Sequence, residues 1–365
     1  PPIRGFGRWS RIGRVCSREL IDGLEILHPR YLLFPRKIFF SLYWISYLVM
    51  LFWTVRNRDF DLIHAHTAYP DGLAALLFGK AVKKPVLITA HGSDINLYPE
   101  ESRIGKILVC FALRHCDAVV AVSSDLKNRI EKLGVNRAKL RVIHNGIDIA
   151  LFSPMDKENA VNQKGLSRRN KRILYTGGLL PVKGVGVLIE AMSILAISRN
   201  DIEMVLVGAD KKGRTDREFI HMAKDLGLQE MVIFVTKVRN TEIPLWLTAS
   251  DVFVLPSLSE GFGLSLVEAL ACGKPVVSTT CGGPEDIVTE EVGILVPPGD
   301  AKALASAIAY VLDHPEKYDS VRISSYARQR FNLEKISSQI FDLYRSLKES
   351  SNVKAHRPRT REPCS

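Results

Sequence analysis

Residues 251–279 read DVFVLPSLSEGFGLSLVEALACGKPVVST, and this stretch decides the fold because a glycine turn and a longer apolar segment lie between two short apolar runs. The short runs are typical of buried strands, and the segment after the glycines predicts a helix. Glu260 precedes the turn, and Glu268 lies inside the apolar segment. A helix that is apolar nearly all round should be buried, where an ionised carboxylate is costly unless something pairs with it. Glu268 therefore either bridges neighbouring backbone or lines a cavity and binds a ligand.

Similar apolar, β-branched runs recur along the chain, with longer helical stretches between them. They are DLIHAH, PVLITAH, AVVAVS and RVIHN before residue 150, and RILYTG, EMVLVG, MVIFVT, DVFVLP, PVVST and GILVPP after residue 171. Strands that alternate with helices predict parallel sheets covered by helices on both faces. The polar stretch between the two sets lacks an apolar period and is interpreted as a linker. We therefore expect an α/β protein with two Rossmann-like domains, at residues 1–150 and 171–332, joined by a linker at 151–170.

The composition is that of a folded protein with basic clusters. The 365 residues are 46% hydrophobic, and the net charge of +11 is concentrated in the first 40 residues, in Lys164–Arg172 and in Lys354–Arg361. Such clusters attract polyanions, but no zinc finger, RNA-binding aromatic motif or basic zipper accompanies them, so no nucleic-acid partner is expected. Anionic lipid headgroups or a phosphate-bearing substrate fit better. The six cysteines show neither Cys-x-x-Cys pairs nor zinc-ligand spacing, which favours a reducing, cytoplasmic compartment and predicts no metal site.

One uncharged, aromatic-rich segment, FFSLYWISYLVMLFWTV at Phe39–Val55, raises the question of a membrane. It lies at the lower limit for a spanning helix, which needs about 20 apolar residues. The strand-like run FDLIHAH follows within a few residues, so a membrane span here would divide a domain. We predict a helix that is buried or lies against a membrane surface. Together with the basic clusters, the segment predicts peripheral contact with the inner face of an anionic membrane.

The polar motifs of the chain follow directly after predicted strands. His91-Gly92-Ser93-Asp94 follows PVLITA, Gly177-Gly178 follows RILYT, Ser257 to Glu260 follows DVFVLP, and Cys281 to Glu285 follows PVVSTT. In open α/β sheets, ligands bind beyond the carboxyl ends of the strands. We therefore expect four loops from two domains to converge on one cleft.

The turn around Glu260 suits a ligand that is both anionic and hydroxylated. Glycines at 261 and 263 allow a close approach of the backbone, and the N–H groups at the start of the next helix offer a phosphate site. Glu260 and Glu268 would accept hydrogen bonds from hydroxyls, and this combination describes a nucleotide sugar. Other nucleotide signatures fail, because ACGKP lacks the first P-loop glycine and no Gly-x-Gly-x-x-Gly follows a strand.

With these motifs the chain resembles the retaining glycosyltransferases of family 4, which have the two-domain GT-B architecture with domains that face each other across a cleft. The similarity covers about residues 60–345 and is carried by PSLSEGFGLSLVEALACGKPVV, HGSD, HNGID, LLPVKG and GGPEDIV. The layout, including HPRYLLFPRK, is also similar to enzymes of cell-surface polysaccharide assembly of the teichuronic acid type. The resemblance implies an acceptor-side domain at 1–150, a donor-binding domain at 171–332, a helix at 333–349 that returns to the first domain, and a disordered basic tail at 350–365.

The resemblance also implies the roles of individual residues. Glu268 would bind the ribose hydroxyls of the donor, and Glu260 would face its sugar ring. Lys183 would neutralise phosphate charge, and His91 would border the anomeric centre, unless it is only a satisfied histidine at a strand end. The backbone of Gly261, Phe262, Gly263, Gly177 and Gly178 would meet the sugar and diphosphate, while Asp94 and Asn145 are assigned to the acceptor side or to structure. Asp94 then caps the next helix. No cofactor and no metal are expected.

The chain departs from the family pattern in two places. Where the family commonly has an arginine, this chain has Gly178. Either the site has lost a phosphate partner, or the glycine is needed for a positive φ or for direct approach of phosphate to its N–H; we favour the need for glycine. The first strand and glycine-rich acceptor loop, expected ahead of Pro1, are missing, so that the first domain is expected to be incomplete.

The sequence therefore predicts a hexosyltransferase that uses a nucleoside-diphosphate sugar and a glycan or lipid-linked acceptor. Two alternatives remain open. The departures allow a sugar-nucleotide-binding protein that has lost catalysis, and the same architecture allows a sugar-nucleotide epimerase that needs no acceptor.

Overall fold

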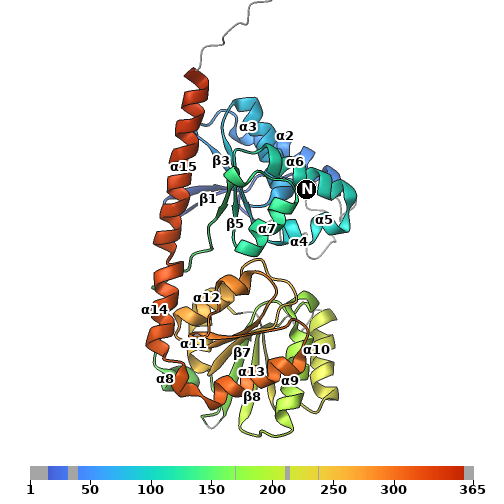
Figure 1. Ribbon diagram of the computed structural model, residues 1–365, viewed down its shortest axis with the longest axis vertical. Helices are drawn as coiled ribbons and strands as arrows, with labels where there is room; N and C mark the ends of the chain where they lie inside the picture. Colours follow the sequence, from blue (N-terminus) through green and yellow to red (C-terminus); the bar gives the residue numbers. More distant parts are fainter. Residues whose placement is uncertain (1–14, 32–39, 169, 210–213, 237, 357–365) are drawn as a thin grey trace, which may run out of the picture. The chain divides into compact units, whose positions relative to one another are not determined.

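The computed structural model describes residues 15–31, 40–168, 170–209, 214–236 and 238–356, and they form two compact units (Figure 1). Unit 1 holds the chain to Val120, residues 129–141 and residues from Asp342 onward. Unit 2 holds residues 121–128 and 142–341. The residues of the predicted linker therefore group with unit 2.

Unit 2 contains a six-stranded parallel sheet in the order β12-β11-β10-β7-β8-β9. Its strands are β7 (Lys171–Thr176), β8 (Ile202–Ala209), β9 (Val232–Thr236), β10 (Val252–Leu255), β11 (Val276–Thr279) and β12 (Gly293–Val296). The sequence predicted each of them. The β-branched side chains of β7, β8, β10 and β11 are almost fully buried, as expected for strands that are covered on both faces, whereas Ile233 of the edge strand β9 is 36% exposed.

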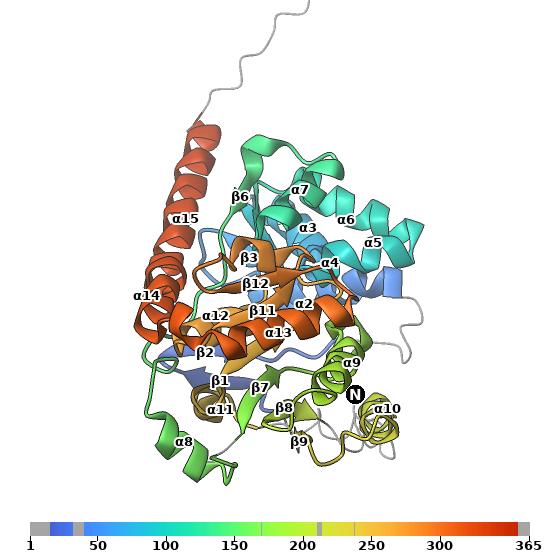
Figure 2. The same ribbon diagram turned by 60° about the horizontal axis from the view of Figure 1, so that its bottom comes forward.

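Helices cover this sheet on both faces. The first group is α9 (Val185–Ala196), α10 (Arg214–Asp225) and α13 (Ala301–Asp313), in which α9 packs against the other two; Figure 2 shows α9 and α10 beside each other. The second group is α11 (Ile243–Ala249), α12 (Leu264–Ala271) and α14 (Ser320–Phe331), in which α12 packs against the other two. From β7 the chain adds β8 and β9 on one side of the sheet, and it then adds β10, β11 and β12 on the other side. The carboxyl ends of β7 and β10 are therefore the topological switch point of the sheet.

Unit 1 is built around a second sheet in the order β3-β4-β5-β6, and the sequence predicted these strands too. They are β3 (Ile63–Ala65), β4 (Val86–Ala90), β5 (Ala118–Ala121) and β6 (Leu140–Val142). Helices α2 (Tyr43–Val55) and α6 (Arg103–His115) both lie beside α3 (Leu73–Val82), which is largely buried, and α7 (Ser124–Lys132) connects β5 to β6. An antiparallel hairpin of β1 (Arg18–Ile21) and β2 (Leu24–Leu27) forms a separate sheet.

The aromatic-rich segment forms a 3₁₀ turn at Phe40–Leu42 followed by α2, while its first residue, Phe39, lies outside the described residues. Only Tyr43 and Met50 of α2 are buried, so the alternative of a buried helix is wrong. Val49 and Trp53 are 51% and 71% exposed. Among the described residues, no helix has both the length and the apolar character that a membrane crossing requires.

Two boundaries differ from the predicted ones. The expected linker contains helix α8 (Lys157–Gln163), because Asp156 caps its first turn by accepting from the N–H of Glu158, and Ala160 and Val161 are buried against α11. The expected disordered tail is corrected in its first part, since helix α15 (Leu333–His356) continues past residue 350. The first helix-breaking residue there is Pro358. Residues 357–365 of the tail lie outside the described residues.

Candidate active site

The predicted donor-side residues gather at the switch point of the unit 2 sheet. The loop after β7 carries Gly177, Gly178 and Lys183, and the loop after β10 carries Glu260 and leads into α12. The two strands are hydrogen-bonded neighbours, so the loops start side by side. Residues distant in sequence are thereby brought to one edge of the sheet, where ligands of open α/β folds bind.

Lys183 and Glu260 form an ion pair. The Nζ of Lys183 lies 2.7 Å from Oε2 of Glu260, and their side chains are 30% and 15% exposed. The hydroxyl of Ser257 lies 3.4 Å from the same carboxylate oxygen. The pair places a cation and a hydrogen-bond acceptor at the same point of the loop cluster.

Gly184 allows this pairing because it brings the two loops into contact. It has a φ of +66°, and a Cβ at this position would lie 1.9 Å from the carbonyl oxygen of Pro256. Next to this contact, the N–H of Leu258 donates to the carbonyl of Val182 at 2.9 Å. Any larger residue at 184 would push the Lys183 loop away from Glu260.

Glu268 lies inside α12, partly buried among apolar side chains. Burial raises the pKa of its carboxyl from 4.5 to about 7, and no hydrogen bond or charge from the described residues offsets that effect. The interpretation that Glu268 bridges neighbouring backbone is therefore not supported. A carboxylate that is buried without a partner among the described residues destabilises the fold when it is ionised, and a ligand with hydroxyl donors would satisfy it.

The Gly261-Phe262-Gly263 turn has its one large side chain buried inside the unit. Phe262 is 3% exposed, and its ring stacks on that of His144 at 5.4 Å. Gly283 supports the turn, because its N–H donates to the carbonyl of Glu260 at 3.0 Å and a Cβ there would lie 2.3 Å from the Cα of Phe262. Gly283 belongs to the GGPEDIV motif, but the motif alone did not predict this supporting role.

In unit 1, His91 and Asp94 lie directly after β4. Asp94 is 4% exposed, and its carboxylate accepts hydrogen bonds from the N–H groups of Ala68 (2.7 Å), Gly92 (3.0 Å) and His91 (3.2 Å). It does not cap the helix that it was expected to cap; instead it fixes the His91 loop to the chain after β3. The ring of His91 is accessible and contacts His66, a residue that the sequence analysis treated only as part of a strand.

Comparison with known proteins agrees with this geometry. Residues 13–151 match the profile Glycosyltransferase Family 4, and residues 156–330 match Glycosyl transferases group 1. A Bacillus subtilis glycosyltransferase named for teichuronic acid biosynthesis, TuaC, is 31% identical over 80% of this chain and 72% of its own. The chain belongs to glycosyltransferase family 4. The resemblance inferred from the motifs is therefore confirmed.

Further relatives of this family 4 glycosyltransferase are similar over most of their length. N-acetyl-alpha-D-glucosaminyl L-malate synthase of Bacillus anthracis is 28% identical over 79% of this chain and 75% of its own. Anabaena HepE in complex with UDP and glucose has a TM-score of 0.74 at 26% identity, and covers 85% of this chain and 84% of its own. Sucrose-phosphate synthase from Thermosynechococcus elongatus, with a TM-score of 0.81 at 23% identity, covers 92% of this chain and 87% of its own and shows the GT-B fold.

Gly178, where this family 4 chain departs from the family pattern, is not strained. A Cβ at Gly178 would meet only Leu180, at 3.8 Å, and its φ lies outside the left-handed region. The neighbour Gly177 has the unusual φ of +148°, and a Cβ there would lie 2.9 Å from the hydroxyl of Tyr175. The form of the favoured explanation in which residue 178 needs a positive φ is therefore wrong, and Gly177 has that φ instead. Direct approach of a phosphate to the N–H of Gly178 stays a prediction.

Asn145 lies in unit 2, half-buried, in the loop after β6. The preceding residue, His144, lies 3.2 Å from a carboxylate oxygen of Asp286 and stacks on Phe262. Asn145 thus lies in the same unit as the predicted donor-side residues, whereas His91 lies in unit 1, and its predicted role on the acceptor side or in the structure stays a prediction.

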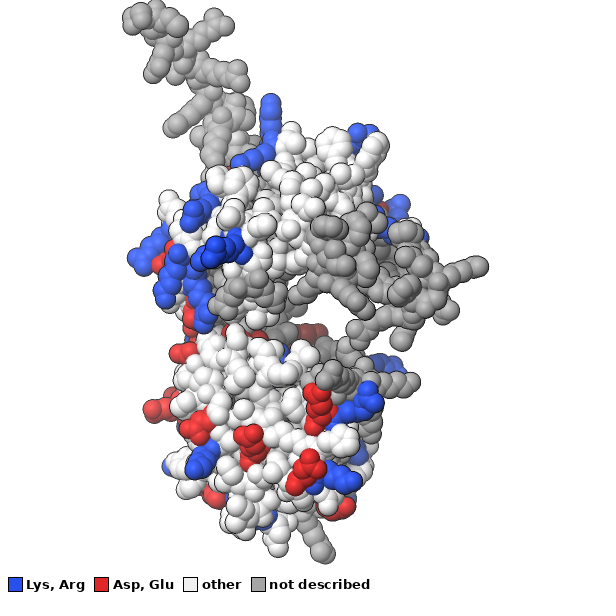
Figure 3. Space-filling model, turned by 90° about the vertical axis from the view of Figure 1, so that its right-hand side faces the viewer, with Lys and Arg blue, Asp and Glu red and all other residues white. Residues whose placement is uncertain are grey.

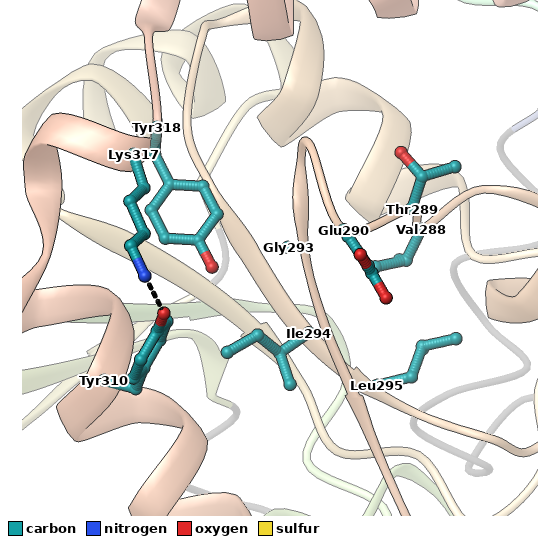
Figure 4. A pocket seen from close by; sticks show the side chains of 9 residues that line it. All are labelled: Val288, Thr289, Glu290, Gly293, Ile294, Leu295, Tyr310, Lys317 and Tyr318. Atoms are coloured by element: carbon teal, nitrogen blue, oxygen red, sulfur yellow. Dashed lines mark hydrogen bonds between the residues drawn. The ribbon is translucent and has the colours of Figure 1, made fainter.

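A separate cavity of about 560 Å³ lies beside β12, at the open edge of the same sheet (Figure 4). Tyr310, Lys317 and Tyr318 form one side of it, with the lysine amine on the hydroxyl of Tyr310, and Glu290 lies opposite. None of the predicted site residues lines this cavity.

Proposed function

We propose that this protein transfers a hexose from a nucleoside-diphosphate sugar to a hydroxyl of a glycan or lipid-linked acceptor, with retention at the anomeric carbon. The observation that carries the proposal is the combination at the switch point: the Lys183–Glu260 pair beside the glycine turn at 261–263, and a carboxylate at Glu268 for which no described residue supplies a partner. A cation for phosphate and two acceptors for hydroxyls match the two chemical halves of a sugar nucleotide.

The relatives guide the choice of donor. HepE, at 26–27% identity, has been crystallised with UDP, with UDP and glucose, and with UDP-glucose. UDP is therefore the nucleotide to test first. The similarity to a glycosyltransferase named for teichuronic acid biosynthesis supports a role in cell-surface polysaccharide synthesis.

In the proposed reaction, the bond between the anomeric carbon and the phosphate oxygen breaks, and a bond to the acceptor oxygen forms on the same face of the sugar. The acceptor proton passes to the departing phosphate oxygen. Lys183 and the N–H groups at the start of α12 stabilise the charge that develops on the diphosphate, so that the chemistry requires no metal. Glu268 binds the ribose, Glu260 orients the sugar ring, and His91 borders the anomeric centre.

Calorimetry with UDP tests the donor site. Glu268→Ala is expected to weaken UDP binding by about 1–3 kcal/mol, because the ribose hydroxyls lose their acceptors. Glu260→Gln is expected to lower turnover more than it lowers UDP affinity, since its proposed partner is the sugar. Glu190→Ala on the exposed side of α9 is the control and should change neither. Unchanged UDP binding in Glu268→Ala would contradict the assignment.

Product analysis separates the alternatives. A binding protein without catalysis would bind a UDP-sugar and neither hydrolyse nor transfer it. An epimerase would interconvert the free sugar nucleotide in the absence of any acceptor. Transfer to an acceptor, with the product linkage determined by NMR, supports the proposal.

Peripheral contact with an anionic membrane, on the cytoplasmic face, is part of the same proposal. Helices α2, α3 and α6 contain no acidic residue, and α6 carries the basic residues Arg103, Lys106 and Arg114. Exposed apolar side chains follow a helical spacing on α6 at Ile104, Ile107 and Phe111, in addition to Val49 and Trp53 on α2. Figure 3 shows a broad area of unit 1 without charged side chains, with lysine and arginine at its margin. Apolar contact together with positive charge is the usual pair of signals for such binding.

Flotation with liposomes that contain phosphatidylglycerol tests this contact. Binding is expected at low salt and should weaken at high salt. Trp53→Ser and Ile107→Ser should each reduce binding roughly tenfold, because burying a large apolar side chain contributes about 1.5–3 kcal/mol. Ile197→Ser is the matched control, since Ile197 is 86% exposed but lies in unit 2. Equal binding of all variants would refute this surface. The basic residues before residue 15 and at 36–37 lie outside the described residues.

A further inference from the structure

We infer that His66 and His91 form one hydroxyl-binding unit, so that His66 is a second substrate-contacting residue of unit 1. The inference rests on the proposed transfer reaction, in which His91 borders the sugar. Nothing in the motif comparison points to His66; its geometry does.

The two histidines come from neighbouring strands. His66 follows β3 directly and His91 follows β4, and these strands pair in parallel. Nδ1 of His66 lies 3.2 Å from Nε2 of His91, and the rings are stacked with centroids 5.4 Å apart and planes 19° apart. The pair therefore stands at the carboxyl edge of the sheet of unit 1.

A third histidine holds this pair in place. The ring of His64 stacks on His66 at 4.3 Å, and both of its nitrogens are occupied: Nε2 by the hydroxyl of Thr89 at 2.7 Å and Nδ1 by that of Tyr344, from α15, at 2.6 Å. The two hydrogen bonds hold the His64 ring in one orientation, and the His66 ring packs against it. The backbone of His91 is fixed in turn by Asp94.

All three rings are expected to be neutral at pH 7. Burial, followed by the neighbouring histidines, lowers the pKa of His64 to about 4. Burial and His91 lower the pKa of His66, and burial lowers that of His91 although Asp94 opposes it.

Neutrality determines what the pair offers to a ligand. One proton is shared between Nδ1 of His66 and Nε2 of His91, and a neutral imidazole carries only one N–H. If His66 donates, its Nε2 is a bare acceptor and Nδ1 of His91 carries a proton. If His91 donates, the two outer nitrogens exchange these roles. In either case the pair presents one donor and one acceptor.

That combination suits a sugar hydroxyl, which is itself both donor and acceptor. No hydrogen bond from a described residue occupies either outer nitrogen, and both residues are exposed. A single lysine or carboxylate would offer only donors or only acceptors, whereas the pair offers both to one hydroxyl or to two adjacent ones.

Two substitutions test the unit through turnover. His66→Phe keeps a ring that can stack on His64 but removes both nitrogens, and transfer from UDP-glucose is expected to fall 10- to 100-fold in kcat/KM. UDP affinity and the unfolding midpoint should stay unchanged. His66→Asn can still hydrogen-bond His91, so it is expected to recover part of the loss. His115→Phe, at another exposed histidine, is the control and should leave transfer unchanged.

Nitrogen-15 NMR of histidine-labelled protein gives a readout independent of activity. Because the shared proton fixes both rings, His66 and His91 should be neutral at pH 7 and show the same tautomer, either both Nδ1–H or both Nε2–H. Opposite tautomers, or a charged ring, would overturn the inference, as would wild-type turnover in His66→Phe or a parallel loss of turnover and stability. If the wild-type protein transfers no sugar but shows the matched tautomers, the proposed reaction fails while the pair itself stands.

Discussion

Gly178→Arg is expected to tighten the binding of UDP, and the structure sets the size of the effect. The substitution costs little, since φ at this position is ordinary and the nearest atom to a new Cβ is Cγ of Leu180 at 3.8 Å. The carbonyl of Gly178, which accepts from the hydroxyl of Tyr175 at 2.8 Å, is unaffected by a side chain. A hydrogen bond to a charged group contributes about 1.5–3 kcal/mol. Because residue 178 is exposed, we expect the lower value, or roughly tenfold in Kd.

Calorimetry with UDP at two salt concentrations measures this gain, which should shrink as salt screens the new charge. Gly178→Ala separates charge from backbone and should bind UDP like the wild type, with a stability gain of at most about 1 kcal/mol from the stiffer unfolded chain. Gly177→Ala is the contrasting control, because its φ of +148° and the Tyr175 hydroxyl 2.9 Å from a Cβ predict a lower unfolding midpoint. Weaker UDP binding in both Gly178 variants would refute the reasoning, since it would show that the phosphate needs the bare backbone.

Three further substitutions test the groups around the site. Glu268→Gln should raise the free energy of unfolding at pH 8 by up to about 3 kcal/mol and have no effect near pH 4. Burial raises the pKa of the folded-state carboxyl from 4.5 to about 7, so the stability associated with this group is complete below pH 4.5 and is lost as the pH rises through 7. Urea titrations at several pH values measure this dependence. Gly283→Ala should lower the free energy of unfolding and weaken UDP binding, each by about 1–3 kcal/mol, because its Cβ would meet the Phe262 backbone at 2.3 Å. Gly186→Ala, with 3.6 Å to the nearest atom, should be tolerated. Asp94→Asn should cost about 1–3 kcal/mol of stability and reduce turnover, because the His91 loop loses its acceptor. Asp61→Asn, at an exposed ion pair with Lys348, is the control and should cost less than about 1 kcal/mol. Equal effects of the two substitutions would show that Asp94 does not organise the loop.

The sequence alone was sufficient for the sheets and for the position of the predicted site loops at the ends of their strands. Apolar runs flanked by turns correspond to all ten strands of the two large sheets described here, because short β-branched runs bounded by turn residues are typical of strands. Glu268 could be singled out because an ionised carboxylate is costly in a helix that is otherwise apolar and buried. The hairpin β1–β2 was missed although Asp22 and Gly23 carried its turn signal; both have positive φ, at 49° and 79°.

Pairings between distant loops could not be predicted. Lys183 and Glu260 are 77 residues apart, and their contact depends on the packing of Gly184 against Pro256. The pattern Gly177-Gly178 shows that a glycine is required but not which of the two carries the unusual φ. His66 was absorbed by the strand pattern of DLIHAH, since its role depends on the register of β3 against β4, which periodicity does not report.

The Lys183–Glu260 ion pair has a consequence for selectivity among phosphates. Before anything binds, the two charges neutralise each other, so a phosphate that draws Lys183 away leaves a half-buried carboxylate without its cation. Inorganic phosphate and pyrophosphate carry no hydroxyl that compensates Glu260. A sugar conjugate brings hydroxyls that can replace the lost partner. Breaking the Lys183–Glu260 ion pair therefore costs free energy that inorganic phosphates cannot recover, and the loop would bind them more weakly than it binds a sugar conjugate.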